Sequence, residues 1–198
     1  MKAITVYQPW AQLLAIGAKK YETRGWATQY RGPIAIHAGM KSFDKTLDEL
    51  FLRIEGVTAA EMNFLDAIRR HFPDDPFLEY FPYGAIIATA ELVGCYKIMN
   101  ISDAYKDCGC SNRDPVCDCK LEKDPNAHIV ALSDQDTLDG LVSIETIAKT
   151  EILFGDWTPG RYVWEIANVN LLPEPIPARG KQGLFNIEGE IYERIHDG

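Results

Sequence analysis

The sequence lacks any apolar run long enough to cross a membrane, since no stretch reaches about 18 such residues. The opening MKAITVYQPW has one lysine and no long apolar segment before a small-residue cleavage site, so a signal peptide is not expected. Apolar residues make up 46% of the 198 residues, and aromatic residues 11%, which argues against disorder. We therefore expect a soluble cytoplasmic protein with a substantial core.

Positive charge is also scarce, because 20 basic residues stand against 29 acidic ones and the net charge is -9. A protein that covers nucleic acid with a broad basic face usually has the opposite balance. The cations are unevenly distributed: residues 1–41 contain six basic residues and a single acid, Glu22. This asymmetry favours a local site for an anionic ligand.

Cysteines are few and clustered. Cys95 stands alone in an apolar segment and is expected in the core. The other four form two CxC pairs in CGCSNRDPVCDC, at Cys108, Cys110, Cys117 and Cys119. Two such arms across a turn could hold four thiolates around a structural zinc ion, while disulfides or free thiols are the alternatives. The sequence requires no other cofactor.

Hydrophobic periodicity predicts an α+β fold. Alternating or continuous apolar residues predict strands at 3–6, 34–38 and 85–98 and from about 161 onward. Helical patterns cover 43–55 and 58–71, and a further helix is expected between Pro9 and Gly17. Strands at both ends with helices between them favour a small mixed or antiparallel β-barrel with helices outside.

One domain is expected over residues 1–198, with no internal repeat. Within it, residues 42–82 form a helical segment, and the polar residues 101–140 form a Cys-rich insertion or long loop. Residues 173–183 are predicted to be an extended loop, and 184–195 a closing strand.

The segment GAKKYETRGW, residues 17–26, places charges of both signs between apolar segments. In an extended chain Glu22 and Arg24 share a face, and Lys19 can join them from the corner after Gly17. A partly desolvated lysine beside an arginine would have a lowered pKa, as a base or nucleophile requires. The alternative is a solvated edge strand with a surface ion pair worth about 0–1 kcal/mol.

The spacing Gly17-x-Lys19-x-x-Glu22-x-Arg24 resembles the GxKxxExR signature of the ASCH domain family, a branch of the PUA-like superfamily. YQPWAQLLAIGAKKYETRGW and YRGPIAIHA are similar to the N-terminal half of bacterial and phage members. FGDWTPGRYVWEI and LPEPIPARGKQGLFNI are similar to the C-terminal half. The resemblance covers about residues 1–41, 84–98 and 143–190.

This resemblance implies a PUA-like β-barrel with a cleft in which the signature residues meet the C-terminal half. It also implies an RNA or nucleotide ligand. Some small relatives hydrolyse N4-acetylcytidine with a Lys, a Thr and a Glu, and others are linked to ribonuclease activity. The Lys corresponds to Lys19, Glu22 occupies the Thr position, and Glu151 is a candidate for the distal carboxylate.

Several further residues are candidates for ligand binding. Tyr7, Trp10 and Trp26 lie near the signature and could stack a base, although Trp10 could equally anchor the core. His37, with no second histidine nearby, is either a satisfied core or rim histidine or a ligand-binding residue. No acid lies between Ile176 and Ile187, so the loop PARGKQG could bring its two cations to a phosphate. The remaining candidates in this set are Arg31, Arg161, Arg179 and Lys181.

Three functions are consistent with these patterns. The first is a binding module that holds RNA or a modified nucleotide in a cationic cleft. The second is a hydrolase of N4-acylated cytidine or RNA, in which Lys19 is base or nucleophile, Glu22 orients it and Arg24 or Lys181 stabilises negative charge. The third is a protein-interaction domain that uses the acidic helices at 42–82. No membrane partner is expected, and we place binding ahead of catalysis.

Overall fold

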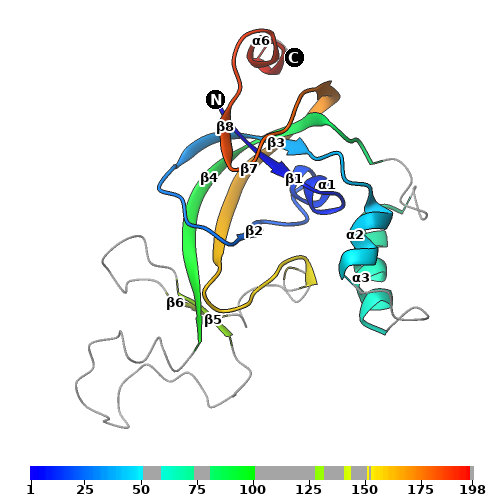
Figure 1. Ribbon diagram of the computed structural model, residues 1–198, viewed down its shortest axis with the longest axis vertical. Helices are drawn as coiled ribbons and strands as arrows, with labels where there is room; N and C mark the ends of the chain where they lie inside the picture. Colours follow the sequence, from blue (N-terminus) through cyan, green and yellow to red (C-terminus); the bar gives the residue numbers. More distant parts are fainter. Residues whose placement is uncertain are drawn as a thin grey trace. The chain divides into compact units, whose positions relative to one another are not determined.

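The computed structural model describes residues 1–50, 59–73, 81–100, 128–131, 141–143, 151 and 153–196 (Figure 1). The chain forms two compact units. The first unit comprises Met1–Lys20, Arg31–Val93 and Ile166–Gly198, and the second comprises Tyr21–Tyr30 and Gly94–Glu165. The long strands β4 (Ala85–Asn100) and β7 (Tyr162–Pro177), green and orange in Figure 1, contribute residues to both units. The single domain expected over residues 1–198 stays a prediction.

Strands of both orientations build the first unit. β1 (Lys2–Val6) pairs in parallel with β3 (Gly32–Ala38) and antiparallel with β8 (Leu184–Asn186). β3 also pairs antiparallel with β4. With helices in the same unit, these pairings confirm the predicted α+β class with mixed strand directions.

The helices lie where the periodicity predicts them. α1 (Trp10–Ala15) buries one apolar face and is followed by Gly17, whose φ of 73° is a left-handed conformation that glycine adopts without strain. α2 (Phe43–Leu50) and α3 (Ala59–Arg69) lie within the two predicted helical stretches. Among the residues described, no helix is both long enough and apolar enough to cross a bilayer.

Two predictions near the C-terminus are wrong in part. β7 continues to Pro177, through the first five residues of the predicted loop 173–183, because Pro173, Pro175 and Pro177 alternate and leave their missing N–H groups on one edge of the strand. The strand expected at 184–195 stops after Asn186, and residues 190–196 form helix α6 (Glu190–His196). Two of its side chains, Ile191 and Ile195, stand four positions apart and pack against the core, so the helical period decides the structure.

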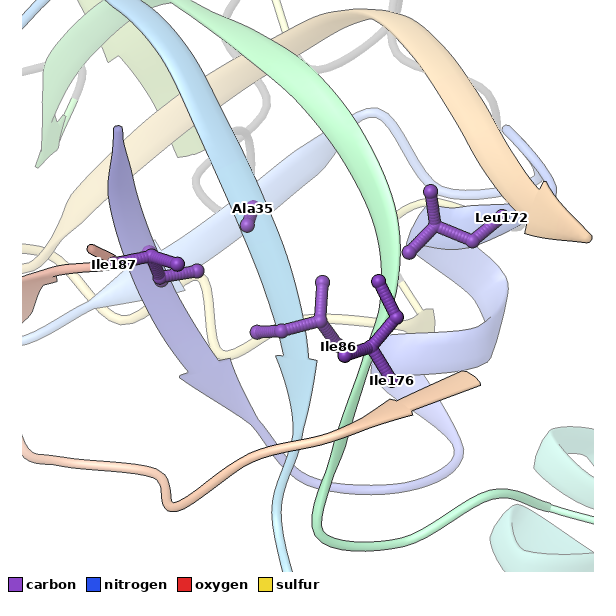
Figure 2. Close-up of a cluster of buried hydrophobic side chains, with 6 residues drawn as sticks. Ala35, Ile86, Leu172, Ile176 and Ile187 are labelled. Atoms are coloured by element: carbon purple, nitrogen blue, oxygen red, sulfur yellow. The ribbon is translucent and has the colours of Figure 1, made fainter. Parts of the chain in front are cut away.

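An apolar cluster in the first unit joins β1, β3, β4, β7 and the end of the chain. Figure 2 shows Ile86 of β4 next to Ile176 of β7, with Ala35 of β3 close by. Partly buried Ala178 and Phe185 pack against this cluster. The cluster therefore fixes the segment that follows β7, which carries the cations of the PARGKQG loop. The buried members are Ala3, Ala35, Ile86, Leu172, Ile176 and Ile187.

In the second unit β2 (Tyr21–Arg24) pairs antiparallel with β7, and the later half of β4 pairs with β5 (His128–Ala131), which pairs with β6 (Leu141–Ser143). The segment 101–140 therefore contains a strand, which the prediction of an insertion or loop did not include. Cys95 is buried, as predicted. The four clustered cysteines lie outside the described residues, and their zinc site stays a prediction.

Candidate functional site

Two parallel strands of the first unit end together at a candidate ligand surface. Thr5 of β1 and His37 of β3 are partners in the strand register, one position before Val6 and Ala38. Both side chains contact the segment that follows β7. We call residues Ala178–Lys181 the latched loop, for the contacts described next.

The buried His37 side chain, which is 1% exposed, holds the start of the latched loop. Its Nε2 lies 2.9 Å from the carbonyl oxygen of Ala178. Since a carbonyl only accepts, Nε2 carries the hydrogen and donates it. Burial lowers the pKa of His37, and the hydrogen bond to Ala178 offsets part of that effect. His37 is therefore a core histidine with a specific backbone partner, and its predicted contact with ligand stays a prediction.

Gly180 lets the latched loop approach this histidine closely. A Cβ atom at Gly180 would lie 2.5 Å from His37 Cε1, 2.7 Å from its Nδ1 and 2.8 Å from Thr5 Oγ1. Any larger residue would push the loop away. Thr5 Oγ1 also donates a hydrogen bond to the carbonyl oxygen of Lys181, at 3.0 Å. The backbone of the loop is thus held at both ends.

The latched loop presents two cations to solvent. Arg179 and Lys181 are exposed, and neither forms an ion pair with any residue that the structure describes. An exposed cation on a fixed backbone segment, with no carboxylate partner among the described residues, is suited to contact a phosphate.

An exposed aromatic ring adjoins the loop through Thr5. Tyr7 is 48% exposed, and its ring lies over Gly39. A Cβ atom added at Gly39 would be 2.7 Å from the Tyr7 ring and 3.2 Å from Thr5 Cγ2, so all three residues are close together. Lys41 Nζ is 5.2 Å from the centroid of the Tyr7 ring, and it also pairs with Glu49. An accessible ring beside cations can stack a base while the cations contact its phosphate. We call the following residues the Tyr7 surface: Thr5, Tyr7, Lys41, Arg179 and Lys181.

Three other candidates of the first unit have different surroundings. Lys19 is 1% exposed, at the corner after Gly17, and its amide donates to the Leu13 carbonyl at 3.0 Å. A fully buried lysine is rare, which makes this residue the most unusual of the signature. Trp10 packs on Phe64 of α3 with ring centroids 6.3 Å apart, as expected of a core anchor. Arg31 immediately precedes β3 and is partly buried.

The remaining signature residues form an ion pair in the second unit. Arg24 Nη2 lies 3.0 Å from Glu22 Oε1, and the Glu22 side chain is only 10% exposed. The pair confirms that these two β2 residues share a face. Because Glu22 already neutralises much of the Arg24 charge, this cation is less available to an outside anion than those of the latched loop.

An edge-to-face pair of tryptophans lies beside this strand. The rings of Trp26 and Trp164 are 4.6 Å apart with an interplanar angle of 89°. Trp164 is fully buried and its Nε1 donates to the Trp26 carbonyl at 3.3 Å, whereas Trp26 is 38% exposed. Trp164 thus supports an accessible ring, although the sequence did not single it out.

Arg161 is also paired. The Arg161 Nε atom lies 3.2 Å from Asp156 Oδ2. Arg161 is also close to Gly25, because a Cβ atom added at Gly25 would be 3.9 Å from Arg161 Nη1. Burial alone would raise the pKa of Asp156, but hydrogen bonds from the Thr158 hydroxyl and amide, with the Arg161 charge, lower it below its ordinary value. This cation is therefore held beside the turn that leads to Trp26.

Glu151, the candidate distal carboxylate, is 5% exposed within the second unit. Its carbonyl accepts a hydrogen bond from Trp157 Nε1 at 3.3 Å. Burial raises the pKa of nearby Tyr21, and the negative charges of Glu165 and Glu151 raise it further. Tyr21 therefore remains a neutral phenol beside these carboxylates.

The structure thus brings the predicted residues together in two groups, each within one unit. Tyr7, His37, Arg179 and Lys181 gather in the first, and the Glu22–Arg24 pair is found in the second. The convergence of Lys19, Arg24 and Lys181 on one cleft stays a prediction. The sequence patterns do not single out Thr5, whereas the glycines on either side of Lys181, Gly180 among them, already indicate a loop whose backbone can approach closely.

The comparisons with known proteins agree with the signature. The chain is a mixed α+β protein with a cationic, aromatic surface, and it matches the ASCH domain family over residues 4–169. It belongs to that family. The chain is 29% identical to human Activating signal cointegrator 1 and 28% identical to the mouse protein, each over 105 residues. These matches cover 52% of this chain and only 16% of either relative.

Proposed function

We propose that this ASCH domain binds RNA or a nucleotide, and that the Tyr7 surface contacts the ligand. The observation that carries the proposal is the latched loop, whose backbone is held by His37 and by Thr5, two residues before the exposed Tyr7. Its cations Arg179 and Lys181 have no carboxylate partners among the described residues. Two fixed cations would contact phosphates, and Tyr7 would stack one base.

The acidic balance of the chain supports a small footprint. With a net charge of -9, a long duplex would be repelled over most of the protein, whereas a short single strand or one nucleotide could contact the Tyr7 surface alone. We therefore favour a single-stranded segment or a mononucleotide over a duplex.

As parts of the same proposal, we infer a PUA-like arrangement similar to that of bacterial and phage members, and action in the cytoplasm. In that arrangement the buried Lys19 would contact the ligand. The hydrolase alternative would use the same Lys19 and needs evidence of turnover.

Binding of a short RNA tests the proposal. A fluorescently labelled single-stranded 12-mer would be titrated at several salt concentrations and followed by anisotropy. For two phosphate contacts on a single strand, the slope of log affinity against log salt should be about -1.4. The double variant Arg179→Ala/Lys181→Ala should lose most of this slope. Lys45→Ala is the matched control, because Lys45 is an exposed lysine on α2 of the same unit.

Two results would contradict the proposal. One is the absence of binding to RNA, DNA or nucleotides by the unaltered protein at low salt. The other is binding that the double variant and the Lys45 variant weaken equally. Release of product from an acylated cytidine or RNA, abolished by Lys19→Ala, would instead establish the hydrolase.

A further inference from the structure

His37 stands out because it is a buried titratable side chain that faces a backbone segment and not a ligand surface. It is 1% exposed and makes a 2.9 Å hydrogen bond to Ala178, the residue just before the two exposed cations. A buried histidine with a backbone acceptor on another segment fixes that segment in place.

Gly180 has the complementary property. A Cβ at this position would come within 2.8 Å or less of two atoms of the His37 ring and of Thr5 Oγ1. Atoms of neighbouring side chains essentially never come that close, so only glycine allows the loop backbone to rest on the ring. The Ala178 amide adds a hydrogen bond to the Gly84 carbonyl at 2.9 Å.

We propose that His37 and Gly180 are positioning residues that hold the latched loop on β1 and β3, so that Arg179 and Lys181 point outward at a fixed place. The hydrogen bond from His37 anchors Ala178, the hydroxyl of Thr5 anchors Lys181, and the missing side chain of Gly180 lets the loop lie against both. The effect of this arrangement on RNA binding rests on the proposed function, but the arrangement itself does not.

Limited proteolysis tests the loop without any ligand. Trypsin cleaves after Arg and Lys, so Arg179 and Lys181 are built-in probes of loop opening. We expect Gly180→Ala and His37→Leu to accelerate cleavage at these two positions by about tenfold, since local opening controls cleavage of a fixed loop. Gln182→Ala, an exposed position in the same segment, is the matched control and should leave the rate unchanged.

The conservative variant His37→Gln separates positioning from general stability. A glutamine amide can donate to the Ala178 carbonyl as Nε2 does, so this variant should retain slow cleavage where His37→Leu does not. Thermal unfolding of each variant identifies those that fail to fold. Unchanged cleavage in both Gly180→Ala and His37→Leu, with the folded state intact, would overturn the proposal, and so would fast cleavage in His37→Gln and His37→Leu alike.

RNA affinity then connects the loop to function. If the unaltered protein binds the 12-mer, Gly180→Ala should weaken binding by about tenfold at low salt and reduce the salt slope, because displaced cations no longer meet the phosphates. If it binds no RNA, the proposed function fails, while the cleavage rates still decide the positioning role. Proteolysis could show that the loop is open in Gly180→Ala while the RNA affinity of this variant is unchanged. That result would show that the latched loop does not contact the RNA.

Discussion

Two pairs of cations in this ASCH domain, one in each unit, have different surroundings. In the second unit, Arg24 lies 3.0 Å from Glu22 and Arg161 lies 3.2 Å from Asp156. In the first unit, Arg179 and Lys181 are exposed on a loop whose backbone is fixed, and no described residue forms an ion pair with them. The positions of Lys and Arg alone therefore do not locate an anion site, because carboxylate partners decide which cations are available.

The aromatic residues of the two units differ as well. Tyr7 is 48% exposed beside the latched loop, whereas Trp26 is 38% exposed and packs edge-on against the buried Trp164. We therefore expect substitutions in the tryptophan pair to change stability most and substitutions at Tyr7 to change binding most.

The largest effect is expected for Trp164→Ala. This side chain is fully buried, so its removal should cost about 3–5 kcal/mol of unfolding free energy, measured by urea denaturation. Trp26→Ala should cost clearly less, because part of that ring already faces solvent. If Trp26→Ala instead lowers RNA affinity more than Tyr7→Ala, the ligand surface belongs to the second unit and the comparison fails.

The next effect concerns the base-stacking ring of the first unit. Tyr7→Ala should weaken RNA binding by about 1–3 kcal/mol, because a stacking platform is lost. Tyr7→Phe keeps the ring and should bind almost normally. Anisotropy titrations of both variants measure the difference, and equal losses in the two would indicate a hydroxyl contact in place of stacking.

A pH effect of intermediate size is expected from His37. Its folded-state pKa lies below the ordinary value of 6.5, so the neutral ring is favoured in the folded protein and the unfolded chain binds the proton first. The contribution of His37 to stability is therefore present above about pH 6.5 and declines as the pH falls below it. Urea midpoints at a series of pH values measure the decline, and His37→Gln should remove its share of it.

The smallest effect is expected for Asp156→Asn. The Asp156 side chain is 55% exposed, so the loss of its pairing with Arg161 should cost about 0–1 kcal/mol at neutral pH. Since the folded-state pKa is lowered below 3.8, this contribution exists above that pH and is lost as the pH falls through the lowered value. Urea denaturation of both proteins at pH 7 and pH 3 measures it. A gain in RNA affinity in Asp156→Asn would show that the pairing with Asp156 restrains Arg161.

Local sequence features predicted much of the fold. Gly17 marked the end of α1, the apolar residues of 85–98 marked β4, and the signature marked the family. The predicted closing strand at 184–195 is wrong from residue 190 onward, where the structure has helix α6. The helical spacing of Ile191 and Ile195 outweighs the strand character of this segment. The number of prolines in 173–177 predicts a loop, but their compatibility with an extended edge strand depends on their register, and the structure places them in β7.

By itself, the sequence determined the family, the mixed α+β class and the scarcity of cations, since these follow from residue order, periodicity and composition. The two-residue period of an extended strand already places Glu22 beside Arg24. The folded chain alone shows that a turn brings Asp156 to Arg161 and that the latched loop is fixed. His37 and Gly180 meet across 143 residues of chain. Contacts between such distant residues depend on how the strands pair and how the core packs, which no local pattern encodes.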